Sequence, residues 1–257
     1  MPTREYYVAF KTIVVREIVR FVRIWVQTVL PAMIMTALYF VIFGNLVGSH
    51  IGTVGGVDFI AFIVPGLILM SVITNAYGNV VSSFYSSKFQ GNIDEMLVAP
   101  IPNWIILVGY ITGGLMRGLV VGLAVTLVAT FFVDMQIHNL TVVITTVILT
   151  ALLFSMAGLV NAIYAKSFDD ISIVPTFVLT PLTYLGGIFY SIDMLNNFWH
   201  HVSLFNPVLY MINAFRFGFL GISDISLVTA YTIIIAFVVG LFVFALFLLE
   251  RGTGIRN

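Results

Sequence analysis

Long apolar runs separated by short polar segments dominate the pattern of this chain. A helix that crosses the hydrocarbon core of a bilayer needs about 20 predominantly apolar residues, and several runs reach that length. Polar residues, glycine or proline punctuate the chain between them. The pattern therefore predicts an all-α polytopic membrane protein with six transmembrane helices. The predicted spans comprise residues 24–46, 59–84, 104–133, 140–164, 171–190 and 227–249.

Two further segments contain apolar residues without forming a regular span. In residues 1–23, apolar and basic side chains follow separate rows at three- and four-residue steps. This spacing predicts an amphipathic helix on the membrane surface, in contact with anionic membrane lipids, although a plain positively charged topology signal is the alternative. In residues 191–226, polar and helix-breaking residues interrupt an apolar stretch, so we expect re-entrant outer helices and not a seventh span. The residues that mark this outer segment are Asn206, Pro207, Tyr210 and Arg216.

The composition leaves no room for a second, aqueous domain. Of the 257 residues, 60% are hydrophobic and only 9% are charged, whereas soluble domains average about 45–50% and about 25%. We therefore expect residues 1–257 to form a single transmembrane domain, with the first five spans in residues 24–190. The net charge is zero and the basic residues form no stripe, so no nucleic-acid partner is expected. The chain has no cysteine, which excludes disulfides and cysteine metal sites.

The Lys and Arg residues fall mainly on one side of the predicted topology. Basic segments near the ends of spans stay in the cytoplasm, so both termini are predicted to be cytoplasmic. In a bacterium, this membrane would be the inner membrane. All four histidines fall on the opposite side. The basic residues on the predicted cytoplasmic side are Arg4, Lys11, Arg16, Arg20, Arg23, Lys88, Lys166, Arg251 and Arg256.

One charged residue, Arg117, lies within a predicted span. A charge in the hydrocarbon is costly, so Arg117 could contact an anionic substrate or pair with a carboxylate, and a structural or snorkelling role is the alternative. No Asp or Glu is expected to be buried, which disfavours a transporter driven by protons or sodium. Glycines near Arg117 recur at about four-residue spacing, which predicts close helix packing. They are Gly109, Gly113, Gly114, Gly118 and Gly122.

The sequence lacks motifs for catalysis. A phosphate-binding loop needs an upstream glycine at a fixed distance, and Lys166-Ser167 lacks it. His200 and His201 are adjacent, so on a helix or strand they would point apart, and we expect no metal site there. The chain is therefore predicted not to be an enzyme and to hold no cofactor.

Aromatic residues recur in and near the predicted spans. They could line a pathway for an amphipathic substrate, whereas ordinary packing and interfacial aromatic belts are the alternatives. The candidates for such a pathway are Tyr39, Phe43, Tyr77, Phe177 and Tyr184.

Four stretches of the chain carry a resemblance to a known family. They are FIVPGL at residues 62–67, GNIDEMLVAPIP at residues 91–102, PTFVLTPLTYLGG at residues 175–187, and FNPVLY at residues 205–210 with Arg216 following. With these motifs, the chain resembles the ABC type-2 transporter permease family over essentially its whole length, near the drug and nodulation-factor exporter branch. Members of this family are the membrane subunits of ATP-driven exporters.

The resemblance implies a homodimeric permease that recruits two separately encoded ATP-binding cassette ATPase subunits, which would hold ATP and Mg²⁺. It also implies a gate or connecting helix near residues 5–23, a coupling helix near residues 88–100 and re-entrant helices near residues 192–220. In the coupling segment we expect polar contacts, a negative patch and exposed apolar anchors for the ATPase. The residues expected to make these contacts are Lys88, Gln90, Asp94, Glu95, Met96 and Leu97.

The predicted function is therefore a permease subunit that forms the pathway for an amphipathic or lipid-linked substrate. A non-ATP-driven channel or secondary transporter is the alternative, and an intramembrane enzyme acting on lipid-linked material is a third. Co-purification of an ATPase would favour the first prediction. Proton-coupled transport by the isolated chain would favour the second, and product formation without a partner would favour the third.

Overall fold

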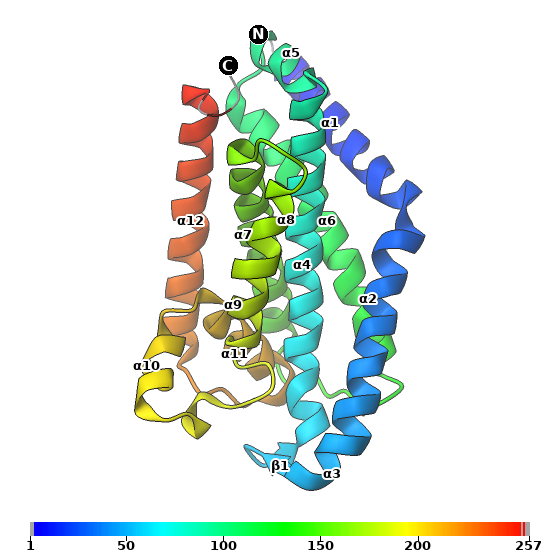
Figure 1. The fold of residues 1–257 in the computed structure, drawn as a ribbon, viewed down its shortest axis with the longest axis vertical. Coiled ribbons are helices and arrows are strands. Elements are labelled where there is room, and N and C mark those ends of the chain that lie inside the picture. The colour runs from blue at the N-terminus through cyan, green and yellow to red at the C-terminus, as the bar shows by residue number, and fades with distance from the viewer. Residues whose placement is uncertain (1–2, 253, 255–257) are drawn as a thin grey trace.

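The computed structural model describes residues 3–252 and residue 254, and its long helices lie side by side in one bundle (Figure 1). The long helices are α1 (Thr3–Arg23), α2 (Trp25–Phe40), α4 (Phe59–Phe89), α6 (Asn103–Ala129), α7 (Leu140–Tyr164) and α12 (Leu227–Arg251). The shorter helices are α3 (Gly48–Ile51), α5 (Asn92–Val98), α8 (Asp170–Val174), α9 (Thr180–Tyr184), α10 (Asn197–Leu204) and α11 (Pro207–Leu220). The remaining elements are π-helical turns at Val41–Val47 and Pro175–Leu179, a 3₁₀ turn at Ile192–Met194, and the antiparallel strands β1 (Thr53–Val54) and β2 (Val57–Asp58).

The two ends of the bundle differ in what they contain. Both ends of the chain lie near α5, at what we call the terminal end (Figure 1). The β1–β2 hairpin, α3 and α10 lie at the opposite end, which we call the hairpin end (Figure 1). Loops that are far apart in the sequence are thus sorted onto two opposite surfaces.

Five helical segments within the described residues are long and apolar enough to cross a membrane. They are Trp25–Gly44, which extends α2 into the following π-helical turn, and helices α4, α6, α7 and α12. The fold is therefore that of an all-α polytopic membrane protein.

The predicted fifth span is the segment that differs most from expectation. Residues 171–190 were expected to form one continuous helix, but the structure has α8, a π-helical turn and α9 in succession, and α9 ends at Tyr184. Pro175 and Pro181 lack the backbone N–H that an α-helix needs, so regular hydrogen bonding cannot continue through them. The Thr180 hydroxyl donates to the Pro175 carbonyl at 2.9 Å, so a side chain satisfies a backbone carbonyl in the irregular segment.

Helix α4 forms the centre of the bundle, where it packs against α7 and α6. In its most apolar stretch 67% of the residues are buried, against 22% in both α2 and α12. Side chains such as Ile63, Leu69 and Ile73 of α4 are completely buried. Helices α2 and α12 therefore keep apolar surface that this chain alone does not cover.

Helix α1 packs along α6 and contains the clearest departure from the sequence prediction. No acidic residue was expected to be buried, and this was wrong, because Glu17 is 0% exposed. Ile13 and Phe21 are also buried, one helical turn before and after Glu17. Residues four apart lie on the same helical face, so Glu17 follows the apolar stripe into the core and not the exposed basic face.

Helix α11 is short and buried and lies between the long helices. It packs against α7, α12 and α4. Asn206 caps it, since its side-chain oxygen accepts a hydrogen bond from Val208 N at 3.0 Å, and Pro207 occupies its first turn. At 14 residues α11 is too short for a regular span.

Candidate functional site

Helix α5 projects at the terminal end, between α4 and α6 (Figure 1). Gly91 separates α4 from α5 with a φ of 77°, a left-handed conformation that glycine adopts without strain. Ile93 is buried and anchors α5 to the bundle. Pro100 follows α5, and Pro102 directly precedes α6, so neither neighbouring helix can run on through this segment. Helix α5 is therefore a separate element with its own boundaries.

The predicted contact residues of α5 differ in exposure. Asp94 and Glu95 are exposed and give the first turn a negative charge. This charge interacts favourably with the positive end of the helix dipole. Met96 and Leu97 were expected as exposed anchors, but they are half-buried and pack against the core. Val98, which follows them in the same apolar run, is 86% exposed. Val98 is therefore the most exposed apolar side chain of α5.

Lys88 and Gln90 make hydrogen bonds within the chain. Lys88 Nζ donates to the carbonyl oxygens of Ile163 and Ala165, at 2.7 Å each. These carbonyls belong to the end of α7, where a helix leaves acceptors without intrahelical partners. Gln90 Oε1 accepts a hydrogen bond from Asn92 Nδ2 at 3.3 Å. The Lys88 ammonium therefore ties the end of α4 to the end of α7.

Aromatic rings cover the space between α4 and the loop that follows α7. The ring centroids of Tyr85 and Phe168 lie 4.9 Å apart, and those of Phe89 and Phe168 lie 5.2 Å apart, both edge to face. Phe89 is nonetheless 69% exposed. With Val98, this gives the terminal end large apolar side chains in two places.

The loop after α7 has a fixed conformation because Ser167 and Asp170 cap each other. The Asp170 carboxylate accepts hydrogen bonds from the backbone N–H of Lys166 at 2.8 Å and of Ser167 at 3.1 Å, and Ser167 Oγ accepts from Asp170 N at 3.1 Å. The hydrogen bonds from Lys166 and Ser167 hold the pKa of Asp170 below its ordinary value, because they favour the charged carboxylate. The loop after α7 is thus braced by an ionised side chain.

A groove of about 410 Å³ runs between α1 and α5. Its α1 wall contains Ile13 and Arg16, and its α5 wall contains Glu95 and Met96. The lining therefore combines apolar side chains with one basic and one acidic group. Such a mixture of an apolar centre and charged groups is typical of protein interfaces.

Arg16 also belongs to a polar network that joins α1 to α4 and α6. Glu17 Oε1 accepts hydrogen bonds from Ser83 Oγ at 2.7 Å and from Arg16 Nη2 at 3.3 Å, and Glu17 Oε2 lies 3.6 Å from Arg20 Nη2. Arg16 Nη2 donates to Tyr110 Oη at 2.6 Å. The network links the groove wall to the two helices at the centre of the bundle. Sequence reasoning missed it, although the Ile13, Glu17 and Phe21 spacing could have revealed it.

The glycines of α6 face α1 and α4 at short range. A methyl group added at Gly109 would lie 2.6 Å from Ile13 Cγ2 of α1. One added at Gly114 would lie 2.6 Å from Val80 Cγ2 and 2.9 Å from the Ala76 carbonyl oxygen, both of α4. The other predicted glycines with neighbours in α1 or α4 are Gly113, Gly118 and Gly122.

Arg117 lies near the middle of α6 and is held by a neutral partner. Its Nε and Nη2 atoms donate to Asn75 Oδ1, at 3.3 and 3.1 Å. Within the part of the chain that the structure describes, two ion pairs are formed, and both involve Glu17 and neither involves Arg117. Arg117 lines a cavity of about 360 Å³ whose other walls come from α2 and α4.

The structure brings three of the five predicted pathway aromatics together. Tyr39 and Tyr184 share a hydrogen bond between their hydroxyl oxygens at 2.8 Å. The ring of Phe43 stacks on Tyr39, with centroids 5.9 Å apart. Phe189 joins them, with its ring centroid 4.8 Å from that of Phe43. These rings connect α2 to the segment around α9.

The other two predicted pathway residues lie elsewhere. Tyr77 is buried in the core, where its hydroxyl accepts a hydrogen bond from Asn161 Nδ2 at 2.7 Å. Phe177 is 74% exposed in the π-helical turn between α8 and α9. Neither residue contributes to the cluster formed by Tyr39, Phe43 and Tyr184.

Two hydrogen bonds from polar side chains fix the outer segment, one to α9 and one from α11 to the end of α10. Asn206 Nδ2 donates to the Leu182 carbonyl at 2.7 Å, and Tyr210 Oη donates to the Leu204 carbonyl at 2.7 Å. Pro207 starts α11 between these two anchors. The polar residues that interrupt the apolar stretch thus fix how the segment folds back.

Arg216 is 1% exposed, and its partners are not carboxylates. Its Nη2 atom donates to the Gly187 carbonyl, and its guanidinium carbon lies 3.8 Å from the centroid of the Phe62 ring. Its Nε and Nη1 atoms have no hydrogen-bond partner among the described residues. Arg216 therefore fastens α11 to the turn after α9 and to the first turns of α4.

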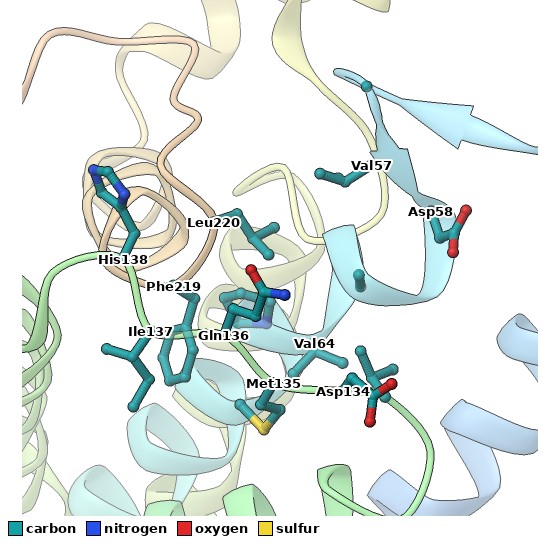
Figure 2. Close-up of a pocket in the computed structure, with 14 residues that line it drawn as sticks. Val57, Asp58, Val64, Asp134, Met135, Gln136, Ile137, His138, Phe219 and Leu220 are labelled. Carbon is teal, nitrogen blue, oxygen red and sulfur yellow. The ribbon is translucent and has the colours of Figure 1, made fainter.

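A cavity of about 480 Å³ opens at the hairpin end, between the start of α4 and the α6–α7 loop (Figure 2). Asp58 and Asp134 lie on one side of it and His138 on the other, with Gln136 between them (Figure 2). No group of three or more potential metal-ligating His, Asp or Glu residues occurs within residues 3–252 and 254. The cavity is a polar recess without a clustered ligand set.

A bundle of long apolar helices, with charged elements gathered at its two ends, defines a polytopic membrane protein. The family model for the ABC-2 type transporter matches residues 8–220. The chain therefore belongs to the ABC-2 type transporter family, the membrane subunits of ABC transporters.

Relatives within this family differ widely in similarity. The chain is 56% identical over 252 residues to the inner membrane transport permease YadH of Escherichia coli K12, covering 98% of each chain. It is 24% identical over 179 residues to nodulation protein J of Rhizobium leguminosarum bv. viciae, covering 69% of each chain.

Proposed function

We propose that this chain is the permease subunit of an ATP-driven exporter in a bacterial inner membrane, and that its terminal end docks an ATP-binding cassette ATPase. In this proposal the chain spans the membrane six times, with both termini in the cytoplasm and the segment from α8 to α9 as the fifth span. Its relative YadH is named an inner membrane transport permease, which supports the location.

The exposed surface of α5 is the observation that carries the proposal. Val98 is 86% exposed on a helix that projects from the same end as both termini, and Phe89 is 69% exposed beside it. Apolar side chains this exposed, next to the acidic Asp94 and Glu95, fit a docking surface better than a solvated loop. The groove between α1 and α5 extends this surface.

Movement of a docked ATPase would reach the spans through rigid contacts. Ile93 and the half-buried Met96 and Leu97 fix α5 to the core. Lys88 couples the end of α4 to the end of α7. A push on α5 would therefore move α4 and α7 together, because packed helices shift as units.

The working unit in this proposal is a homodimer. Helices α2 and α12 each keep most of their apolar surface uncovered, and lipid and a second copy of the chain can share it. The aromatic cluster of Tyr39, Phe43 and Tyr184 lies on α2 and near α9, where it could border a pathway for an amphipathic or lipid-linked substrate.

Two substitutions in α5 test this proposal. Val98→Asp places a charge in the apolar contact, and Glu95→Lys reverses the local charge. Both side chains are exposed, so the variants should insert and fold normally. We expect both to lose co-purification with the ATPase subunit and substrate-stimulated ATP hydrolysis in lipid.

Val228→Asp is the matched control, since Val228 is 79% exposed in the first turn of α12 at the other end of the bundle. It should retain the ATPase. If Val98→Asp and Glu95→Lys both keep wild-type ATPase recovery and stimulation, α5 is not the docking element. Proton-coupled transport by the isolated chain would instead support the secondary-transporter alternative.

A further inference from the structure

The cavity that Arg117 lines lies between α2 and α4. Helix α2 runs from the terminal end toward the hairpin end, and α4 runs back (Figure 1). Residues late in α4 therefore lie opposite residues early in α2. The two ends of this cavity, which we call the Arg117 groove, differ in chemistry.

The end of the groove nearer the terminal end is polar. Its lining includes Gln27 and Thr28 from α2, Thr74 and Asn75 from α4, and Arg117 from α6. Arg117 lacks a carboxylate partner among the described residues, and its hydrogen bonds from Nε and Nη2 both go to the one oxygen of Asn75. A guanidinium has five N–H donors, so this arrangement leaves donor capacity unused at the groove.

The other end of the groove is mostly apolar. It lies between α2 and the first half of α4, and its lining includes Tyr39, whose hydroxyl shares a hydrogen bond with that of Tyr184. The α2 wall is only lightly covered, since Met35 is 54% exposed. The apolar residues that line this end are Ala32, Met35, Tyr39, Leu67 and Met70, and Thr36 and Ser71 add two hydroxyl groups.

We propose that the Arg117 groove binds the anionic headgroup of an amphiphile that enters from the bilayer. The phosphate or carboxylate of the ligand lies on Arg117, and part of its apolar chain lies along Met35 and Leu67. A full positive charge within a spanning helix is costly, and an anion at the groove stabilises it. Because α2 faces outward, such a ligand reaches the groove sideways, without passing through either end of the bundle.

A substitution at Asn75 tests whether ligand binding depends on the positive charge of Arg117, without removing Arg117. In Asn75→Asp, a carboxylate takes the place of the amide oxygen that already accepts both hydrogen bonds from Arg117. The ion pair satisfies the guanidinium, and the site loses its free positive charge, while the hydrogen bond from Asn75 Nδ2 to the Ser71 carbonyl at 3.0 Å is given up. Arg117→Gln removes the charge directly, and Arg251→Gln removes an arginine at the end of α12, where it lies over the Phe247 ring.

The experiment uses the full chain in phosphatidylcholine nanodiscs with traces of photoactivatable lipid. The two probes are phosphatidylglycerol and phosphatidylcholine that carry the same diazirine acyl chain, and cross-linked peptides are identified by mass spectrometry. We expect phosphatidylglycerol to label the peptides that contain Met35 and Met70 about tenfold more than phosphatidylcholine does, as one charge-assisted contact allows. Asn75→Asp and Arg117→Gln should abolish this preference, and Arg251→Gln should keep it.

Soluble glycerol phosphate in excess separates a bare anion site from an amphiphile site. It should compete weakly, because it cannot use the apolar end of the groove. Full competition would overturn the proposal of an amphiphile, and equal labelling by both lipid probes would overturn the anion site. Labelling by neither probe, as expected if a second copy of the chain fills the groove, would also overturn it. Binding needs only the permease, so these outcomes do not depend on whether α5 docks an ATPase.

Discussion

Three glycine-to-alanine substitutions test whether α6 packs against α4 and α7 as closely as the structure indicates. Gly114, in α6, has the least room, since an added methyl group would meet Ser155 Oγ of α7 first and would lie 2.6 Å from Val80 Cγ2 and 2.9 Å from the backbone oxygen of Ala76 in α4. Gly118 has slightly more, with 3.1 Å to Ala76 Cβ. Gly78, in α4, has nothing within 4 Å. All three are helical, so the intrinsic gain from Gly to Ala is common to them.

Comparing the three variants separates the cost of overpacking from the gain in helix propensity. Alanine in place of glycine gains roughly 1 kcal/mol of helix propensity at every site. Overpacking costs about 1–3 kcal/mol where the neighbours cannot move, and the backbone oxygen beside Gly114 cannot move without displacing α4. Gly114→Ala should therefore be less stable than Gly78→Ala by about 1–3 kcal/mol, and Gly118→Ala should lie between them.

The assay is thermal unfolding of purified protein in one detergent, followed by size-exclusion chromatography. For a chain of this size each kcal/mol shifts Tm by about 2–4 °C, so the gap between Gly114→Ala and Gly78→Ala should be roughly 2–12 °C. Equal Tm values for the three variants would refute close packing at this helix face.

Three further substitutions or labels examine other parts of the structure. Arg216→Ala leaves the Gly187 carbonyl without its donor and opens a cavity, so it should reduce folded yield more than Arg216→Lys does; equal yields would mean that this buried contact contributes nothing. Glu17→Ala should lower Tm more than Glu17→Gln, because only glutamine can still accept from the Ser83 hydroxyl, and the reverse order would contradict the network. A cysteine at Asn92 should react with an impermeant reagent only after cell lysis or permeabilisation, and one at Asn139 should react in intact cells; the opposite result would invert the topology.

The sequence predicted the long helices well because a long apolar run leaves few other structures open to the chain. The start and end of α7, residues 140–164, match the prediction. The segment after it does not, because Pro175 and Pro181 shift the backbone hydrogen bonds, and hydropathy does not register that effect. Apolar content alone therefore located this segment without revealing that its helix is broken.

The role of a charged residue in the candidate sites depends on which residues of the same chain it contacts, and a single sequence does not reveal these contacts. Glu17 was missed because it sits between arginines in a basic segment, and only its spacing from Ile13 places it in the core. Lys88 was assigned to the partner surface, but the carbonyls that it contacts lie some 75 residues later in the chain. Tertiary contacts of this kind decide whether a charge faces outward or into the bundle.

Docking of the ATPase on α5 is the central claim, and site-specific cross-linking tests it most directly. The chain has no native cysteine, so Val98→Cys can carry a photoreactive group at a single position. In cells that express the ATP-binding cassette subunit, we expect illumination to join the two proteins through Val98→Cys and not through Val228→Cys. A complex that co-purifies intact but gives no adduct from Val98→Cys, or gives one from Val228→Cys, would contradict the account.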